Sequence, residues 1–313
     1  MQNEAVCPIP QRISLNHHIY RTGNVPDSLR HLILDISRAA KYIHYAIRNT
    51  EAGLAGTRNQ FGEEQEKLDV LSDDIIRQHL CESRVVASYV SEEQSEAVEL
   101  DPTAPYTVVF DPLDGSSLVD VNFAIGSIFG IYKGMHVIGS TPGDQVAALY
   151  VLYGPRTLLV YSVGNSVHEF ILNEVGEFIL LREFLGVADI AKNYSPGNLR
   201  AVNVNAGYRS LMDVWMKEEM TLRYSGCMVA DVHHILSKGQ GIFTNIGGGK
   251  YPLGKLRLVI ECGPFAYLME QAGGAASDGT QSILKKKIDS LDQRSPLIIG
   301  SKTEVKRVCK MLK

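Results

Sequence analysis

Apolar residues recur at steps of three and four in several segments of the chain, which is the pattern of an amphipathic helix. Residues 28–49 show it most clearly, and Pro26-Asp27 just before them is a plausible helix start. Helices are also predicted at 68–80, 144–154, 208–220, 228–237 and after Pro264.

Short apolar runs of β-prone residues end abruptly in acidic residues. Residues 85–90 lead into Glu92-Glu93, and residues 106–110 lead into Asp111 and Asp114. A strand followed by a polar turn is how open α/β sheets present ligand groups at strand ends. Further strands are predicted at 123–132, 157–163 and 241–245. Strands and helices therefore alternate, and we expect an α/β chain with a first domain at 1–195 and a second at 196–313.

The composition of the chain disfavours several classes of protein, among them nucleic-acid-binding, membrane and disulfide-rich proteins. The chain has 313 residues, 45% hydrophobic and 21% charged, with a net charge of -4. This balance does not favour nucleic acid as a partner. No apolar run approaches the roughly 18 residues that span a membrane, and the N-terminus lacks a signal-peptide pattern. A cytoplasmic location is therefore expected. The five cysteines show no C-x-x-C spacing, which argues against a disulfide framework or structural zinc.

Carboxylates are the most informative residues of the chain. Besides the acids at the two strand ends, Asp69 begins a helix and Glu261 ends the run 255–261. Carboxylates that converge repel one another unless cations neutralise them. Oxygen ligands favour Mg²⁺ or Mn²⁺, and the Leu113 carbonyl could join them.

The residues after Asp114 suit an anion. Gly115 permits a sharp turn, and Ser116 and Ser117 offer hydroxyl and N–H groups. A metal site beside a phosphate site indicates phosphoryl transfer to water, with one carboxylate accepting the proton of the water.

Three other interpretations of these segments are weaker. An EF-hand beginning at Asp111 would place Leu113 and Asn122 at ligand positions. A P-loop at 249–255 would have Leu256 where Ser or Thr should hold magnesium. A plain surface turn would explain DPLDGSS alone, but not the other acids.

The string FDPLDGSSLVDVNFAIGSIFGIY resembles the signature of class I fructose-1,6-bisphosphatases and the related sedoheptulose-1,7-bisphosphatases. The resemblance covers nearly the whole chain. It includes GLAGTRNQFGEEQEKLDVLSDD, VSEE, RYSGCMVADVH, LGKLRLVIECGPFAYLMEQAGG and QRSPLIIGS. DPxDGS alone also fits enzymes similar to inositol monophosphatase, but the other segments do not.

The resemblance implies a layered αβαβα sugar-phosphatase fold with two mixed-sheet domains, assembled as a homotetramer or dimer. It implies that a sugar bisphosphate loses its 1-phosphate with the help of Mg²⁺, for which Mn²⁺ can substitute. The implied metal ligands are Glu92, Glu93, Asp111, Asp114, Glu261 and the Leu113 carbonyl. The implied catalytic residues are Asp69, Glu93 and Glu63. The implied substrate contacts are Asp114, Gly115, Ser116, Ser117, Asn205, Arg223, Tyr224 and Lys255, with Arg223 reaching a neighbouring subunit.

Without the resemblance, these residues would be assigned ordinary structural roles. Asn205 would be a turn residue, Tyr224 a core residue and Arg223 a surface charge. Lys255 and Arg257 alternate with leucines and would form the solvated face of a strand.

The chain departs from the family pattern at two positions, and the second bears on substrate choice. Glu63 stands where the resemblance leads us to expect Asp, and Asn245 stands where fructose-bisphosphatases carry a tyrosine near the 6-phosphate. We expect fructose 1,6-bisphosphate as the main substrate, with sedoheptulose 1,7-bisphosphate as the alternative or second substrate. A non-catalytic sugar-phosphate-binding regulator is a remote alternative, because every implied metal ligand is present. A monophosphatase is disfavoured, since Arg223, Tyr224 and Lys255 suit a second phosphate.

Overall fold

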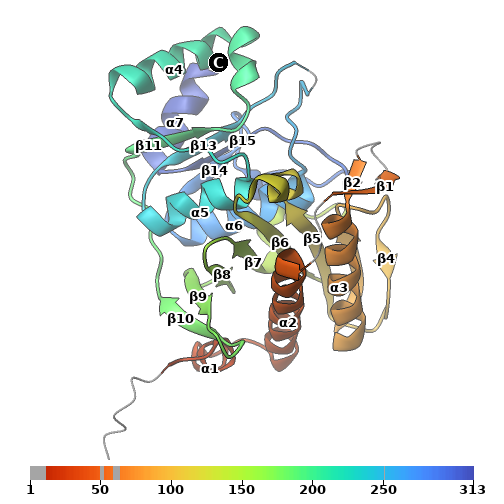
Figure 1. Cartoon of the computed structure of the whole chain (residues 1–313). Helices are drawn as coiled ribbons and strands as arrows, with labels where there is room; N and C mark the ends of the chain where they lie inside the picture. The colour runs from red at the N-terminus through yellow and green to blue at the C-terminus, as the bar shows by residue number, and fades with distance from the viewer. Residues whose placement is uncertain (1–11, 50–52, 59–63, 250) are drawn as a thin grey trace, which may run out of the picture.

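The computed structural model describes residues 12–49, 53–58, 64–249 and 251–313 (Figure 1). Its α-helices are α1 (Leu15–Arg21), α2 (Asp27–Asn49), α3 (Lys67–Ser83), α4 (Ala206–Lys217), α5 (Met228–Lys238), α6 (Gly263–Gln271) and α7 (Lys302–Met311). The predicted helices at 28–49, 68–80, 208–220, 228–237 and after Pro264 are confirmed as α2, α3, α4, α5 and α6. In the described part of the chain, no helix is both long and apolar enough to cross a membrane.

The larger of two main sheets has the strand order β10-β9-β8-β7-β6-β5-β3-β4. Its strands are β3 (Val86–Ser91), β4 (Val98–Glu99), β5 (Tyr106–Asp114), β6 (Ile125–Lys133), β7 (Gln145–Tyr153), β8 (Thr157–Ser162), β9 (His168–Leu172) and β10 (Phe178–Arg182). The β3–β5 pair is parallel and the other pairs are antiparallel. The predicted strands at 85–90, 106–110, 123–132 and 157–163 are confirmed as β3, β5, β6 and β8.

The smaller sheet has the order β12-β11-β13-β15-β14. Its strands are β11 (Asn193–Pro196), β12 (Thr221–Leu222), β13 (Ile242–Asn245), β14 (Ala275–Ser277) and β15 (Leu297–Gly300). It is mixed, because β11 pairs in parallel with β12 and β13 while β15 is antiparallel to its neighbours. A separate hairpin joins β1 (Leu54–Arg58) to β2 (Glu64–Glu66). The domain boundary near residue 195 stays a prediction; β11 spans that position.

Helices and sheets alternate in five layers (Figure 1). The apolar face of α2, which includes Ile33 and Ile36, packs with one face of the large sheet. The opposite face of that sheet shares a core with α5, α6 and the small sheet, through Tyr150, Phe265 and Phe243 among others. Helices α4 and α7 cover the outer face of the small sheet. The predicted αβαβα architecture is confirmed.

The prediction of a helix at 144–154 is wrong, because Gln145–Tyr153 forms β7 in the interior of the large sheet. Helices cover both faces of this sheet, so nearly every side chain of β7 is buried. A strand buried on both faces shows a continuous apolar run instead of strict alternation, and periodicity cannot separate such a run from a buried helix.

The parallel pairing of β3 with β5 brings the acidic residues at their C-terminal ends close together. Both strands run in the same direction, so their C-terminal ends lie at one edge of the sheet. The β5 strand continues to Asp114, which is further than predicted, and carries its acidic residues within the strand.

Candidate active site

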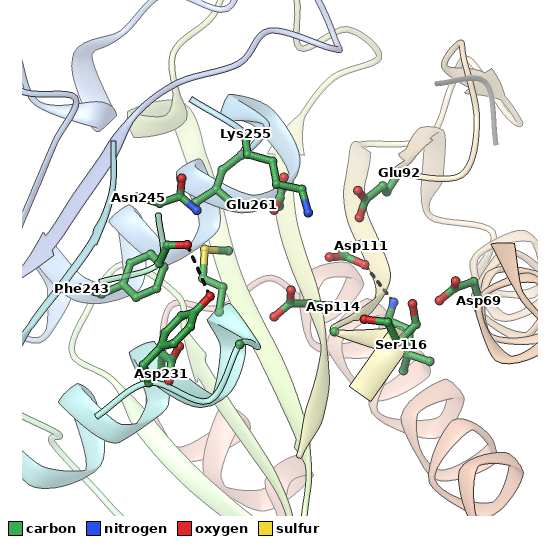
Figure 2. Close-up of a pocket in the computed structure, with 18 of the residues that line it drawn as sticks. Asp69, Glu92, Asp111, Asp114, Ser116, Asp231, Phe243, Asn245, Lys255 and Glu261 are labelled. Atoms are coloured by element: carbon green, nitrogen blue, oxygen red, sulfur yellow. Dashed lines mark hydrogen bonds between the residues drawn. The ribbon is translucent and has the colours of Figure 1, made fainter. Parts of the chain in front are cut away.

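A cavity of about 270 Å³ lies where the end of β5 meets the small sheet and α5. Its lining includes all six predicted acids that the structure describes, namely Asp69, Glu92, Glu93, Asp111, Asp114 and Glu261. Figure 2 labels each of them except Glu93. Leu113, Gly115, Ser116, Ser117, Tyr224 and Lys255 line it as well. Residues that are nearly 200 positions apart in the chain are therefore brought together.

Backbone geometry holds the acids of the first wall in place. The Glu92 N–H donates to the Phe110 carbonyl at 3.0 Å, which carries the β3–β5 pairing up to the acids. Asp111 Oδ1 accepts a bond of 2.9 Å from the Leu113 N–H. Gly115 then turns the chain with φ +82°, and a Cβ atom there would lie 3.0 Å from that of Cys227. A side chain at position 115 would disturb the turn that brings Ser116 and Ser117 to the cavity.

Asp114 connects the two halves of the site. Its Oδ2 accepts a bond of 2.8 Å from the Val229 N–H in the first turn of α5, and the Cys227 thiol lies 3.1 Å from the same oxygen. An anionic side chain is favoured at a helix N-terminus. Asp114 therefore joins the edge of the large sheet to a helix that packs below the small sheet.

Burial and mutual repulsion raise the pKa of three acids at the site. Burial is the main cause at Asp111, whose pKa is well above its usual range, and Glu92 and Asp114 add repulsion. The pKa of Asp114 is raised for the same main reason, although the Val229 N–H opposes the shift. The pKa of Glu261 rises to about 8, through burial first and the neighbouring Glu92 second. The site is therefore short of positive charge, as expected of a cation-binding site.

Arg257 is part of this wall, and its interpretation as a solvated residue is wrong. Its side chain is only 1% exposed, and its guanidinium group forms an ion pair with Glu92. Residues Leu258–Cys262 form a π-helical turn instead of extending a strand. This turn directs the Arg257 N–H to Glu261 Oε2 at 2.6 Å. Arg257 therefore offsets part of the negative charge of the acids.

The opposite wall of the cavity holds its basic and neutral polar residues, together with one acid on α5. Lys255 and Asn245 lie on this side (Figure 2), and Tyr224 and Arg294 also line it. The Tyr224 hydroxyl donates a long bond of 3.4 Å to the Gly197 carbonyl. The residue is 51% exposed, so its interpretation as a core residue is wrong.

Asn245 is the most unusual residue of this wall. It is 7% exposed, and its Oδ1 has no hydrogen-bond partner among the described residues. Buried polar atoms are usually paired, so this amide is suited to a ligand group or to water.

Two predicted residues that the structure describes do not line the cavity, and a third lies outside the described residues. The Asn205 side chain caps α4 by accepting a bond of 2.8 Å from the Tyr208 N–H, and it does not line the cavity. Arg223 is exposed and its side chain donates to the Leu222 carbonyl at 2.9 Å. Glu63 lies outside the described residues.

Two charged residues of the cavity were not singled out from the sequence. Arg294 lines the basic wall, and Asp231 lines the cavity from α5. Burial raises the pKa of Asp231 to about 6, while the Ser225 N–H donates to it at 2.8 Å. Both residues lie in segments that carry the family resemblance, QRSPLIIGS and RYSGCMVADVH. That resemblance was the available signal.

Two models of known protein families together match almost the entire chain. Residues 11–183 match the model of the fructose-1-6-bisphosphatase N-terminal domain, and residues 187–313 match that of its C-terminal domain. The chain is 46% identical over 298 residues to a class 1 fructose-1,6-bisphosphatase of Citrifermentans bemidjiense, covering 94% of this chain and 90% of the relative.

A plant relative and a solved structure extend this comparison. A chloroplastic sedoheptulose-1,7-bisphosphatase of Triticum aestivum is 40% identical, over 92% of this chain and 74% of the relative. The holo form of Leishmania major fructose-1,6-bisphosphatase has a similar structure, with a TM-score of 0.91 and 30% identity, covering 96% of this chain and 99% of that one.

Proposed function

Because this chain belongs to the fructose-1,6-bisphosphatase family, we propose that it hydrolyses the 1-phosphate of fructose 1,6-bisphosphate to give fructose 6-phosphate and inorganic phosphate. The observation that carries the proposal is the two-sided cavity. Buried acids form one wall, and Lys255, Tyr224 and Arg294 line the other. A bisphosphate has a reacting end for the first wall and an anionic far end for the second.

The acidic wall suits Mg²⁺, with Mn²⁺ as a substitute. The ligands would be Glu92, Asp111, Asp114, Glu261 and the Leu113 carbonyl, with Glu93 nearby. They fit because they are oxygen donors, which these cations prefer, and because burial first and mutual repulsion second raise the pKa values of Asp111 and Glu261, so that a bound cation would stabilise their ionised forms. When bound, such cations neutralise phosphate oxygens and activate water.

Other residues of this wall would bind the 1-phosphate and accept a proton. Gly115, Ser116 and Ser117 would hold the 1-phosphate with hydroxyl and N–H groups. Glu93 or Asp69 would accept the proton of the attacking water, because both line the cavity beside the other acids. A positioned general base contributes about 10²–10⁴-fold to a rate. Glu63, which the resemblance adds as a third catalytic residue, stays a prediction.

The far phosphate would meet Tyr224 and Lys255. Asn205 stays a predicted contact: its Oδ1 caps α4 by accepting from the Tyr208 N–H, and its side-chain NH2 group is the donor left for a phosphate. Arg223 is exposed, which suits the expected contact with a neighbouring subunit in a homotetramer or dimer. We further propose a cytoplasmic enzyme without a nucleic-acid or membrane partner.

A second substrate, sedoheptulose 1,7-bisphosphate, is favoured by Asn245. Asparagine is smaller than the tyrosine expected there, and its Oδ1 is unpaired in the described structure. The two substrates share the reacting end and differ by one carbon toward the far phosphate. A methylene-sized difference is worth about 1–3 kcal/mol. Both should therefore be hydrolysed, with kcat/KM values within roughly 200-fold of each other.

Phosphate release from the two bisphosphates, measured side by side with added Mg²⁺, tests the proposal. Activity should disappear in chelator and return with Mg²⁺ or Mn²⁺. Asn245→Tyr should shift the kcat/KM ratio toward the fructose compound, while Leu253→Ala, at an exposed position nearby, should leave the ratio unchanged. Full activity in chelator would refute the metal assignment. Absent sedoheptulose-bisphosphate hydrolysis, with an unaltered fructose rate in Asn245→Tyr, would refute the role of Asn245.

A further inference from the structure

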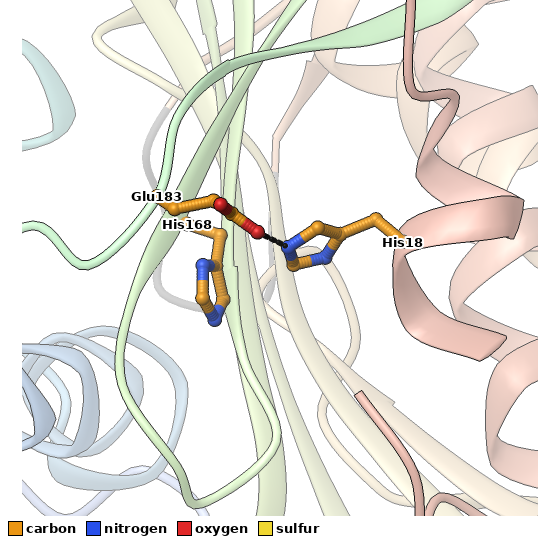
Figure 3. Close-up of side chains that lie close together, drawn as sticks. All are labelled: His18, His168 and Glu183. Atoms are coloured by element: carbon orange, nitrogen blue, oxygen red, sulfur yellow. Dashed lines mark hydrogen bonds and ion pairs between the residues drawn. The ribbon is translucent and has the colours of Figure 1, made fainter. Parts of the chain in front are cut away.

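Two histidines and a glutamate lie close together outside the acidic cavity, and Figure 3 shows the three side chains. His18 comes from α1, His168 begins β9, and Glu183 follows β10 directly. One ligand atom of each residue lies within 4.8 Å of the others. None of the three lines the candidate active site.

The two imidazole rings are buried, and one is incompletely bonded. His18 is 1% exposed and His168 is 2% exposed. His168 Nε2 lies 3.2 Å from the Ser166 hydroxyl, whereas His168 Nδ1 has no hydrogen-bond partner in the described structure. An unpaired buried nitrogen is uncommon in native proteins and calls for an explanation such as an ion.

The surroundings of His18 resemble those of a metal-binding histidine. Its Nε2 faces Glu183 Oε1 at 3.0 Å, and its Nδ1 lies 2.7 Å from the Tyr161 hydroxyl on the other side of the ring. Histidines that bind metals usually bond their second nitrogen to such a partner, which fixes the ring and its tautomer. Burial lowers the pKa of both histidines, so the neutral rings keep a lone pair for coordination.

Glu183 gives the cluster its negative charge and is the member of the cluster that solvent reaches. Its side chain is 30% exposed, and Oε1 accepts the bond from Arg21 at 2.7 Å. Arg21 is half exposed and occupies only Oε1. Glu183 Oε2 is thus the oxygen left for an incoming ion, and solvent can complete the coordination.

We propose that His18, His168 and Glu183 form a second metal site, which binds Zn²⁺ or a similar first-row transition metal ion. Two imidazole nitrogens and one carboxylate oxygen, with a water molecule as the fourth ligand, form an established donor set for tetrahedral zinc. Imidazole favours zinc-like ions, whereas the oxygen-only acids of the cavity favour Mg²⁺. The bound ion would attach α1, a helix of only seven residues, to the edge of the large sheet.

Titration of the metal-free full-length protein with Co²⁺ tests this site, since tetrahedral Co²⁺ absorbs strongly in the visible range and Zn²⁺ displaces it. The background variant Glu261→Gln, which removes one ligand of the acidic cavity, simplifies the Co²⁺ titrations, whereas folding and activity are measured with position 261 unchanged. His168→Gln and the shape-matched Glu183→Gln should each lose one equivalent of Co²⁺ together with its absorption. His17→Ala is the matched control, because His17 is the exposed neighbour of His18 on the same helix.

Tyr161→Phe separates coordination from packing. It keeps the aromatic ring and removes only the hydroxyl that orients His18, so metal affinity should fall about 10–100-fold. Far-UV circular dichroism and Mg²⁺-dependent phosphatase activity should stay unchanged in Tyr161→Phe and Glu183→Gln, which shows that both variants fold. Equal Co²⁺ stoichiometry and equal spectra in the Glu261→Gln background with and without His168→Gln or Glu183→Gln would overturn the proposal and leave a packed pair of neutral histidines.

Discussion

Glu261 and Glu169 are both buried carboxylates, and their surroundings differ in charge. Glu261 lies in the acidic cluster formed by Glu92, Asp111, Asp114 and Glu261, for which Arg257 is the buried basic partner. Glu169 lies in a second cluster with Tyr150, Arg182 and His233, called here the Glu169 cluster. Arg182 Nε donates to Glu169 Oε2 at 2.6 Å, and the Arg182 guanidinium also bonds Ser237.

The difference shows which buried charges serve structure and which serve function. Glu169 is 0% exposed and has a directly bonded cation. The acidic cluster holds four carboxylates, and burial together with mutual repulsion raises the pKa of three of them. Repulsion of this kind lowers stability unless a cation binds. The acidic cluster should therefore govern activity, and the Glu169 cluster should govern stability.

The largest effect is expected at Glu93, beside the acidic cluster. Glu93→Gln keeps the shape of the side chain and removes the base, so kcat should fall by about 10²–10⁴ with little change in KM. Steady-state phosphate release measures both constants. Glu96→Gln, an exposed acid three residues further on, should behave as wild type. A raised KM with unchanged kcat would make Glu93 a binding residue instead.

Glu261→Gln should lower kcat by about 10²–10³, because removal of one electrostatic stabiliser costs roughly 2.7–4 kcal/mol. In chelator, however, the free energy of unfolding should hold or rise, since one repelling carboxylate has been neutralised. Urea unfolding of the metal-free protein checks this second result. Lower stability of the metal-free variant would mean that Glu261 is mainly a structural residue.

The acidic cluster could be predicted from the sequence because its signal is local. Glu92 and Asp111 directly follow β-prone apolar runs, and parallel strands bring their C-terminal ends to one edge. Arg257 could not be placed in this way. Its alternation with leucines is typical of a strand, and only the π-helical turn at Leu258–Cys262 directs it into the core.

In the fold, too, the elements with a local sequence pattern could be predicted, and those that depend on distant contacts could not. Helix α2 has one buried face, so its period is visible in the sequence. The β7 strand is buried on both faces and its apolar run carries no period. Asn205 was assigned by resemblance to the substrate site, yet its side chain caps α4. Which of several partners a polar side chain binds depends on contacts that the sequence does not show.

In the Glu169 cluster, a substitution should lower stability and leave activity unchanged. Arg182→Met leaves Glu169 buried without its cation. Removing one partner of a fully buried pair costs 3–5 kcal/mol; Arg182 is 39% exposed, so we expect about 2–3 kcal/mol. Urea unfolding measures the loss, and kcat should stay unchanged. Lys287→Met, which breaks an exposed pair with Asp289, should cost at most about 1 kcal/mol. A large loss of kcat in Arg182→Met would remove the distinction between the clusters.

The most gradual effect is expected from pH and concerns His233. Burial lowers the pKa of His233 to about 4 from an ordinary value of 6.5. The groups facing it are the Tyr150 hydroxyl at 2.9 Å, Glu169 at 3.7 Å, and more distantly Arg182, His234 and Arg156. Because the folded state keeps this ring neutral, the unfolded chain binds more protons between pH 4 and 6.5. Stability contributed by neutral His233 is therefore present above pH 6.5 and is lost as pH falls toward 4.

The slope for one proton is at most about 1.4 kcal/mol per pH unit. His233→Gln should remove this share of the slope between pH 6.5 and 4, whereas His31→Gln, at an exposed position on α2, should not. The His168 pKa is lowered in the same direction, so the variant should retain part of the wild-type slope. Urea unfolding at several pH values in chelator gives both slopes. Identical slopes in wild type and His233→Gln would show that this histidine is already protonated in the folded protein, and that the Glu169 cluster carries more positive charge than its geometry indicates.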